Sequence, residues 1–266
     1  MPITCPVDVR CLTAEEFEEL DYKVMGHAFA SQNELGRLCD EGVCQRDIQA
    51  RLLAVGFREV QIEVPVTVSH AGYSKVYLVD LVADHAVYEL KTAAVLTREH
   101  QAQLLHYLFL LGVTRGKLIN FRSPKVEGRI HATRLSPEAR HRVTVDATRW
   151  QDVSSECATL RQTMVELVED WGAFLDFALY QDALTHLLGG EALVVQRLPL
   201  HRSRVFLGTQ RFHLHSQGIA FQITAVATEV EAAEAQLRRL LPLTNLRALQ
   251  WITLNRATIQ FVTLTR

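Results

Sequence analysis

The sequence lacks a strong net charge, a long hydrophobic run and an apolar N-terminal segment. Its formal net charge of −2 creates no global field toward nucleic acid or an anionic membrane, so any such binding must rest on a local patch. No apolar run approaches the roughly 20 residues of a membrane-spanning helix. The opening segment MPITCPVDVR does not have the hydrophobic centre of a signal peptide. We therefore expect a cytoplasmic protein that does not enter a membrane.

Cysteine is also scarce. The five cysteines stand at positions 5, 11, 39, 44 and 157, and no CxxC pair occurs. An odd number without a disulfide-type spacing favours free thiols. Cys39 and Cys44 have no second Cys or His pair at a matching spacing, so the pattern does not favour a structural zinc site.

Lysine is rare, with five Lys against 23 Arg. Arginine stays charged in any surroundings, whereas the pKa of a lysine responds to its site. In a chain with this bias, a lysine inside a strand is not a casual choice. Lys91 stands at the end of an apolar segment, 86–91, that has the pattern of a strand.

The first half of the chain alternates helix and strand patterns. A capping box at 13–16 begins a helix that is expected to end at Gly36, and Asp40 begins a second one that closes at Gly56. The predicted buried stripe of this second helix is Val43, Cys44, Ile48, Leu52 and Val55. The segments that follow are strands around 60–64, 76–83 and 86–91, a helix at 97–112 and a strand at 117–121. The predicted order is α-α-β-β-β-α-β.

The short polar break Asp84-His85 separates two of these strands and determines their register. For a two-residue or a four-residue loop, paired positions sum to 169, so Asp80 faces Glu89 with Cβ atoms about 5 Å apart. Strand alternation places Glu89 and Lys91 on one face. The apolar residues expected on the same face are Val76, Leu78, Val82 and Val87. Two carboxylates and one lysine are thus predicted side by side on an otherwise apolar surface.

Burying such groups without partners would cost several kcal/mol. A divalent cation removes the repulsion between the carboxylates and supplies the missing partner. Oxygen ligands suit Mg²⁺ or Mn²⁺ rather than zinc, and one metal-bound water could attack a phosphorus atom. A hairpin with a salt-bridged surface face stays open as an alternative, because a Glu-x-Lys pattern arises easily by chance.

The segment VDLVADHAVYELK has the Asp…Glu-x-Lys form of the PD-(D/E)XK nuclease superfamily. More closely, residues 20–125 resemble the GxxExxY proteins, a branch of that superfamily. The blocks that match in order and spacing are NELG (33–36), CDEGV (39–43), YLVDLVADHAVYELK (77–91), LTREHQAQLLHYL (96–108) and KLINFRSPKVEG (117–128). The resemblance implies an α/β fold with the αβββαβ core of the superfamily and a mixed sheet. It agrees with the order of elements predicted above.

The resemblance also implies roles for individual residues. Asp80 and Glu89 would bind Mg²⁺ or Mn²⁺, with the Leu90 carbonyl as a further ligand. Glu41 would reach the metal through water. Lys91 would orient or activate the attacking water and steady the phosphate.

Gln103 and Tyr107 match the Gln-x-x-x-Tyr of the family, and their i,i+4 spacing puts both on one side of a helix bordering the site. An ordinary amphipathic helix edge stays open for this pair, as does a solvated first-turn position for Glu41. Two positions depart from the family pattern: its motif Gly is Leu38 here, and its motif Tyr is Cys44. These departures concern the approach of the second helix to the site, not the metal pair.

The second half of the chain is less informative. Residues 115–149 hold nine Lys or Arg against three acids, which suits either a solvated surface or a phosphate contact. We expect a nuclease-like domain at 1–125, a basic connecting segment at 126–150 and a smaller α+β domain of unknown role at 151–266. Its expected elements are a helical region at 152–188, strands at 191–198, 203–208, 211–215 and 219–226, a helix at 228–241, and a hairpin of 246–254 with 257–264. His213 and His215 share a strand face, but without a third ligand they indicate packing rather than a metal.

The leading hypothesis is a Mg²⁺- or Mn²⁺-dependent nuclease that cleaves DNA, with a homodimer implied by the superfamily. The alternative is a weakly active or inactive nuclease-fold protein that serves as a nucleic-acid-binding or protein-interaction scaffold. A third hypothesis gives the function to the C-terminal half as a protein–protein module. Asp80→Asn is expected to stop metal-dependent cleavage and to stabilise the metal-free protein slightly, because it relieves the facing carboxylates.

Overall fold

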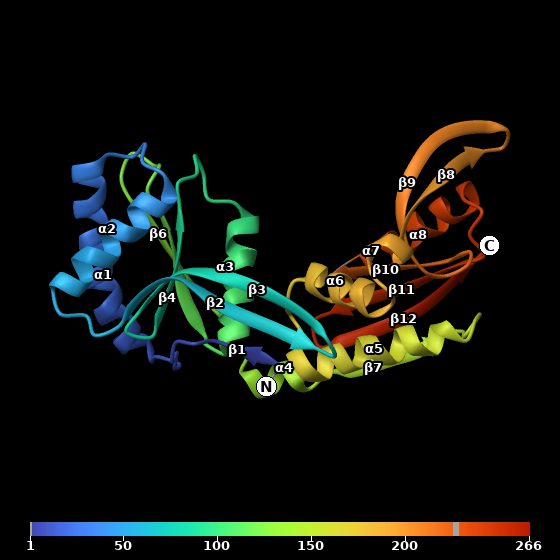
Figure 1. The fold of residues 1–266 in the computed structure, drawn as a ribbon, viewed down its shortest axis with the longest axis horizontal. Helices are drawn as coiled ribbons and strands as arrows, with labels where there is room; N and C mark the ends of the chain where they lie inside the picture. The colour runs from blue at the N-terminus through green and yellow to red at the C-terminus, as the bar shows by residue number, and fades with distance from the viewer. Residues whose placement is uncertain (1, 226–228) are drawn as a thin grey trace. The chain divides into compact units, whose positions relative to one another are not determined.

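The computed structural model describes residues 2–225 and 229–266. The chain has a mixed α/β architecture with two six-stranded mixed sheets (Figure 1). It divides into two compact units: the first is the chain up to Val68 with Lys75–Ala139, and the second is Ser69–Ser74 with Arg140–Arg266. Within the described ranges, none of the helices combines the length and the apolarity that crossing a membrane requires. All five cysteines are free thiols, as the spacing predicts.

The sheet of the first unit has the order β1-β2-β3-β4-β5-β6. β4 and β5 run parallel, and α3 provides the crossover that a parallel pair requires. The strands are β1 (Ile3–Thr4), β2 (Val60–His70), β3 (Tyr73–Ala83), β4 (Ala86–Lys91), β5 (Arg115–Asn120) and β6 (Glu127–Ala132), and the helices are α1 (Ala14–Leu35), α2 (Glu41–Ala54) and α3 (Arg98–Leu111). The predicted order of elements is present from α1 to β5, and β1 and β6 extend the sheet beyond it.

The signals for helix ends in the sequence are confirmed in α1. The Thr13 hydroxyl accepts a hydrogen bond from the Glu16 amide, and the Glu16 carboxylate accepts one from the Thr13 amide. Gly36, with φ of 75°, ends the helix in a conformation that favours glycine. These local signals therefore place α1 without help from tertiary structure.

The predicted buried stripe of α2 is only partly correct. Cys44, Ile48 and Leu52 are buried at i,i+4 spacing, whereas Val43 and Val55 are exposed. Residue 43 lies one position, or about 100°, away from this stripe, and residue 55 lies beyond the last helical residue. The buried face is therefore narrower than the apolar pattern indicates.

The β3–β4 hairpin has the register that the sequence predicts. Asp84 and His85 form a two-residue turn with φ of 43° and 74°, the left-handed pair of a type I′ hairpin. The paired residues are Ala83–Ala86, Val82–Val87 and Leu81–Tyr88. This ladder ends one pair short of Asp80 and Glu89, so the prediction that these two residues face each other as a strand pair is not confirmed.

The apolar face expected around the acids is shorter than predicted. Val82 and Val87 are fully buried, but Val76 and Leu78 are about half exposed. Because β3 leaves the ladder before this point, strict alternation does not continue along it. Tyr77 instead packs its ring against the α3 side chains, with centroids 4.6 Å from His106 and 6.3 Å from Tyr107.

Helices cover both faces of the first sheet, with α1 and α2 on one side and α3 on the other (Figure 1). The core under α1 and α2 includes Phe17, Val24, Ile48, Leu52, Tyr88 and Leu90. Because Tyr88 and Leu90 point into this core, the alternate β4 residues Glu89 and Lys91 point toward the side of α3. The fold thus brings the acid–lysine pair to the end of β4, near both α2 and α3.

The second unit is built on a sheet of order β7-β12-β11-β10-β9-β8. Its strands are β7 (Thr144–Arg149), β8 (Val195–Arg202), β9 (Val205–Ser216), β10 (Ile219–Ala225), β11 (Ala248–Asn255) and β12 (Thr258–Thr265). Its helices are α5 (Glu156–Trp171), α6 (Phe177–Leu187), α7 (Glu191–Val194), α8 (Val230–Leu240) and the short η1 (Leu241–Leu243), while α4 (Pro137–His141) spans the boundary of the two units.

Several predicted boundaries in this unit are wrong. The helical region 152–188 is two helices, because Gly172 takes φ of 78° and Asp176 caps a new helix at the Ala178 amide. The strands predicted at 203–208 and 211–215 are one continuous strand, β9. The final turn lies one residue later than expected, at Arg256-Ala257. The predicted ends at residues 226 and 228 lie outside the described residues.

Residues 126–150, expected as a connecting segment, contribute to both sheets. β6 pairs with β5 in the first sheet, and β7 pairs with β12 in the second. The short α4 lies between them. The functional assignment of the domains stays a prediction.

Candidate metal centre

Asp80 is positioned at the point where the β3–β4 ladder ends. Its Oδ2 accepts a hydrogen bond of 2.8 Å from the Leu90 amide, so the side chain replaces the strand carbonyl that would otherwise bind that amide. Its Oδ1 accepts a bond of 3.1 Å from Gln45 Nε2 on α2. With only 9% of its surface exposed, Asp80 is held by three elements of the fold.

Glu89 and Lys91 form a close ion pair beside Asp80. Lys91 Nζ lies 2.7 Å from Glu89 Oε1 and 3.4 Å from Asp80 Oδ2. Glu89 is fully buried, and its second oxygen, Oε2, has no hydrogen-bond partner among the described residues. Burial, and then the charge of Asp80, raise the pKa of Glu89 to about 8 despite the opposing effect of Lys91. Burial alone would lower the pKa of Lys91, but the carboxylates of Glu89 and Asp80 outweigh it and raise that pKa.

Glu41 joins this group from the first turn of α2. Its Oε1 lies 3.8 Å from Lys91 Nζ, and its side chain is about one-third exposed. Partial burial and the charge of Asp80 raise its pKa, while Lys91 and the Thr92 amide act in the opposite direction. Glu41 therefore lies beside Lys91 with a partly buried side chain, and its role in the site stays a prediction.

Three carboxylates thus surround one ammonium. With Asp80, Glu89, Glu41 and Lys91 all ionised, the group carries a net charge of −2 in a mostly buried place. Such an excess is costly unless another cation compensates it. Burial first, and then the charge of Asp80, raise the pKa values of Glu89 and Glu41.

Gln103 and Tyr107 border this group rather than join it. Gln103 Nε2 donates to the Tyr107 hydroxyl at 3.1 Å, as their spacing on α3 allows. Tyr107 is buried, and its pKa is raised by burial and further by the charges of Glu89 and Asp80. The charges of Glu89 and Asp80 therefore act on Tyr107, and Gln103 contacts the hydroxyl of that side chain.

Gln45 is a residue that the sequence analysis missed. It is buried and holds Asp80 by a hydrogen bond, although glutamine is not an obvious partner in a helix pattern. Its signal in the sequence is its i,i+4 spacing from Glu41, which puts both on one side of α2. Cys44, next to it, lies in the core, and burial raises its pKa to about 11, so it is not an activated nucleophile.

The carboxylate oxygens of Asp80, Glu89 and Glu41 suit a divalent cation with oxygen ligands, although the Lys91 ammonium lies among them in this structure. Within the part of the chain that the structure describes, no three His, Cys, Asp or Glu side chains form a ready metal cluster. Glu89 nevertheless presents a buried carboxylate oxygen without a partner, close to a second carboxylate. A hard cation such as Mg²⁺ or Mn²⁺ suits these oxygens, whereas zinc would favour nitrogen or sulfur ligands.

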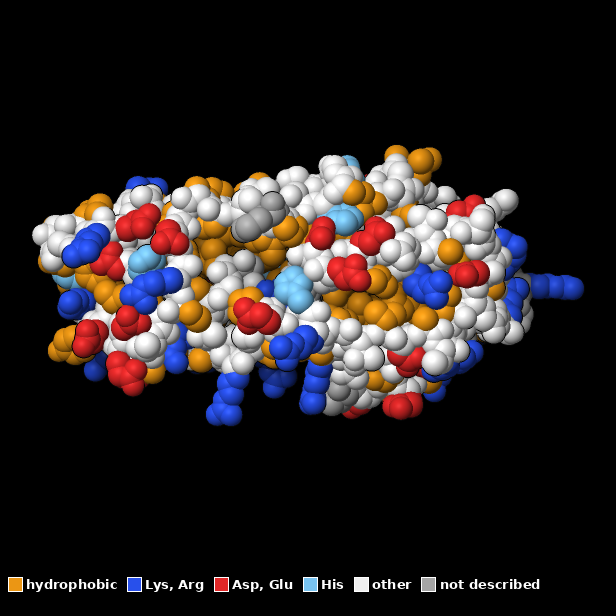
Figure 2. Space-filling view, turned by 90° about the horizontal axis from the view of Figure 1, so that it is seen from below, with side chains coloured by type: hydrophobic (Ala, Val, Ile, Leu, Met, Phe, Trp, Pro, Cys, Tyr) orange, Lys and Arg blue, Asp and Glu red, His pale blue; other side chains and the backbone are white. Residues whose placement is uncertain are grey.

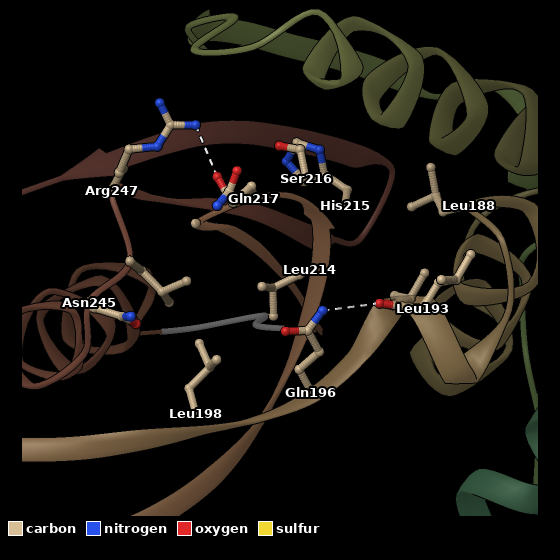
Figure 3. A pocket seen from close by; sticks show the side chains of 13 residues that line it. Leu188, Leu193, Gln196, Leu198, Leu214, His215, Ser216, Gln217, Asn245 and Arg247 are labelled. Carbon is tan, nitrogen blue, oxygen red and sulfur yellow. Dashed lines mark hydrogen bonds between the residues drawn. The ribbon is translucent and has the colours of Figure 1, made fainter.

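The second unit contains a cavity of about 840 Å³ of a different character (Figure 3). Leucine side chains and amides line most of it, and Arg247 is the one charged side chain in its lining. Arg247 donates to the Gln217 carbonyl at 2.9 Å. The lining holds no pair of carboxylates and no aligned nucleophile and base, so it does not have the composition of a hydrolytic site.

His213 and His215 belong to packing, as the sequence analysis expects. Both rings pack near Phe221, and His213 contacts the Gln181 amide. Burial lowers the pKa of both, and that of His215 falls to about 4. The His215 Nε2 lies 3.9 Å from Cys157 Sγ, a fully buried thiol that no substrate can reach.

A comparison with family models identifies a related family. Residues 18–132 match the family described as the PD-(D/E)XK nuclease superfamily. The match spans α1 to β6 and includes all seven candidate site residues. No curated protein and no solved structure matches the chain significantly. The closer resemblance to the GxxExxY branch stays a prediction.

Proposed function

We propose that the first unit is a metal-dependent nuclease that hydrolyses phosphodiester bonds of DNA. The observation that carries this proposal is the buried carboxylate pair Asp80 and Glu89 around Lys91, inside the segment that matches a nuclease superfamily. The αβββαβ order from α2 to β5 supports the same assignment. A cytoplasmic location, a homodimer and membership of the GxxExxY branch stay predictions.

The ion would be Mg²⁺ or Mn²⁺, held by Asp80 and Glu89, with the Leu90 carbonyl as a further ligand and Glu41 acting through water. When bound, it supplies Lewis-acid activation of a water and of the phosphate. The roles of the Leu90 carbonyl and of Glu41 rest on the resemblance. The proximity of Glu41 to Lys91 supports the second of them.

The other side chains would hold the Asp80 carboxylate in place and orient the water and the substrate. Gln45 and the Leu90 amide fix the two oxygens of Asp80, so this carboxylate is preorganised. Lys91, with its raised pKa, stays protonated and can hold a phosphate oxygen or orient a water at Nζ. Gln103 and Tyr107, hydrogen-bonded to each other at the border of the group, would contact the substrate backbone.

The departures at Leu38 and Cys44 do not remove Glu41 from the group. Leu38 is 76% exposed before α2, and Cys44 is buried in the core. Glu41 still lies 3.8 Å from Lys91. The substitutions at these two positions would thus affect substrate contacts rather than the arrangement of the carboxylates.

A nucleic-acid-binding or scaffold protein with little or no turnover is the second candidate. The observation that favours it is the close Lys91–Glu89 pair, which compensates one carboxylate without a metal. The two candidates make different predictions for cleavage.

The test is calorimetric titration of Mn²⁺ into the wild type and Asp80→Asn, followed by incubation of each with plasmid and single-stranded DNA. Asp8→Asn, at an exposed position of the same unit, is the matched control. Binding and cleavage by the wild type and the control, but not by Asp80→Asn, is the expected result. Metal binding without cleavage supports the scaffold. No binding to any variant overturns the metal centre.

A further inference from the structure

The second unit has a two-stranded extension that the proposed active site does not use. We call residues 195–211 of β8 and β9 the arm; Figure 1 shows the two strands leaving the rest of their sheet as a ribbon. β8 is the edge strand, paired only with β9. From His201 to Leu207 every residue is exposed. A packing role within the unit does not account for this exposed stretch.

The arm is basic and contains no acid. Residues 192–228 have no Asp or Glu but include Arg197, Arg202, Arg204 and Arg211. Among the described residues, only Arg211 of these four has a salt-bridge partner, the exposed Glu191. By contrast, Figure 2 shows acidic and basic side chains intermixed over the face that it presents. A local positive field on a chain of net charge −2 is the patch that binding a polyanion requires.

Two of these arginines face each other across the ribbon. Arg197 and Arg211 are direct strand partners, and like charges in this arrangement destabilise a sheet. An anion between them would turn this repulsion into a shared contact, because a guanidinium binds phosphate through several donors. Glu191 pairs with Arg211 only, so Arg197 has no salt-bridge partner among the described residues, and the opposed pair is a second observation that points to an anionic ligand.

The two faces of the arm differ. Leu198 and Leu200 pack on the core of the unit on one face. The other face presents Arg197 and Arg211 near the root and His201 opposite Phe206 near the tip. The rings of His201 and Phe206 lie with centroids 5.5 Å apart, and Phe206 is 59% exposed. One solvent-exposed face thus combines guanidinium groups with an aromatic pair.

We propose that the arm binds duplex nucleic acid, lying in the major groove with its arginines on the flanking phosphates. A two-stranded β-ribbon fits the width of that groove, and phosphate contacts by arginine supply most of the affinity. This inference rests on the proposed nuclease function and names the element that holds the substrate. The charge of the arm argues for a polyanion over an apolar protein partner for the exposed Val205 and Leu207.

The test measures binding of a fluorescent 30-base-pair DNA duplex by anisotropy over a range of salt concentrations. All proteins carry Asp80→Asn to prevent cleavage. The arm variant is Arg197→Gln/Arg202→Gln/Arg204→Gln. The control, Arg142→Gln/Arg239→Gln/Arg256→Gln, removes the same charge from exposed positions outside the arm. We expect the arm variant to bind at least about tenfold more weakly at physiological salt, and its log K against log salt slope to shrink by about 2–3, since each phosphate contact contributes roughly 0.9.

Equal weakening in the control variant, no weakening in the arm variant, or an unchanged salt slope would overturn the inference. If the arm arginines raise the affinity for single-stranded DNA as much as the affinity for duplex DNA, or more, the assignment of the arm to the major groove would also be wrong. Tryptophan fluorescence checks folding, because all three tryptophans lie in the second unit. If duplex binding depends on the arm but the wild type does not cleave DNA, the inference stands and the nuclease proposal fails. If a protein with the three arm substitutions and an unchanged Asp80 cleaves DNA normally, the inference about the arm fails and the nuclease proposal stands.

Discussion

The two units use charge in opposite ways. In the first, Asp80, Glu89 and Lys91 are almost buried, and Lys91 lies within hydrogen-bond distance of both carboxylates. In the second, Arg197 and Arg204 on the arm are exposed and form no salt bridge within the described residues. Buried charges must be compensated at short range, whereas exposed charges cost little to leave without partners. Burial therefore distinguishes the proposed catalytic group from the proposed nucleic-acid-binding surface.

The first unit also contains a second buried ion pair, outside the group around Lys91. Lys117 Nζ lies 2.5 Å from Asp21 Oδ2, and both side chains are about 10% exposed. Here one ammonium meets one carboxylate, while Lys91 meets three. The difference in stoichiometry, not in burial, supports the cation site that we propose around Lys91. Lys91 and Lys117 are thus a matched pair of lysines on neighbouring strands.

The largest expected effect comes from Lys91→Met. Cleavage should fall on the order of 10³-fold or more, the scale expected for an essential catalytic group. Mn²⁺ should bind at least as tightly as to the wild type, because the competing ammonium is gone. Calorimetry with Mn²⁺ and plasmid cleavage measure the two effects. Weaker Mn²⁺ binding would mean that Lys91 stabilises the metal site instead of competing with the metal. Lys91 and Lys117 would then no longer differ in role as we propose.

Lys117→Met should instead affect stability. Removing one partner leaves Asp21 buried and unpaired, which costs about 3–5 kcal/mol. Urea unfolding followed by far-ultraviolet circular dichroism measures the loss, and tryptophan fluorescence reports separately on the second unit. The double variant Asp21→Leu/Lys117→Met should recover much of the stability and keep Mn²⁺ binding. Loss of Mn²⁺ binding in that folded double variant would mean that the two lysines do not have separate roles.

Local patterns predicted much of the first unit. The capping box at Thr13, the two-residue turn at Asp84-His85 and the register beyond it depend on neighbours in sequence. Since β-strand alternation then brings Glu89 and Lys91 to one face, the centre of the site could be inferred as well. The contact of α2 with Asp80 through Gln45 could not, because it depends on how a helix packs over the sheet.

Because these packing contacts cannot be predicted from the sequence, the expected effect of Asp80→Asn on stability changes once the structure is known. The sequence pattern predicted that Asp80→Asn would stabilise the metal-free protein by relieving two facing carboxylates. In the structure, the Asp80 oxygens accept bonds from Gln45, the Leu90 amide and Lys91. An amide cannot accept from all three donors, so we now expect a loss of about 1–2 kcal/mol.

The arm could not be predicted from the sequence, for a physical reason. Gly208, with φ of 128°, and the bulge between Leu200 and His201 interrupt the periodicity, so β9 was predicted as two strands. The absence of acids over 192–228 is plain in the sequence, but its meaning depends on pairing. Only the register shows that Arg197 and Arg211 face each other on an exposed ribbon.

The smallest expected effect lies in the second unit, where burial acts on a neutral group. His215 has a pKa of about 4, lowered by burial, against an ordinary value near 6.5. Between these two pH values the unfolded chain binds the proton and the folded unit does not, so stability falls as pH decreases through this window. Because His215 is only partly buried, we expect a loss on the order of 1 kcal/mol, measured by urea unfolding with tryptophan fluorescence. His215→Gln should flatten this dependence, while replacement of the exposed His201 should leave it unchanged. A slope that persists in His215→Gln would place the acid sensitivity of the second unit in another group.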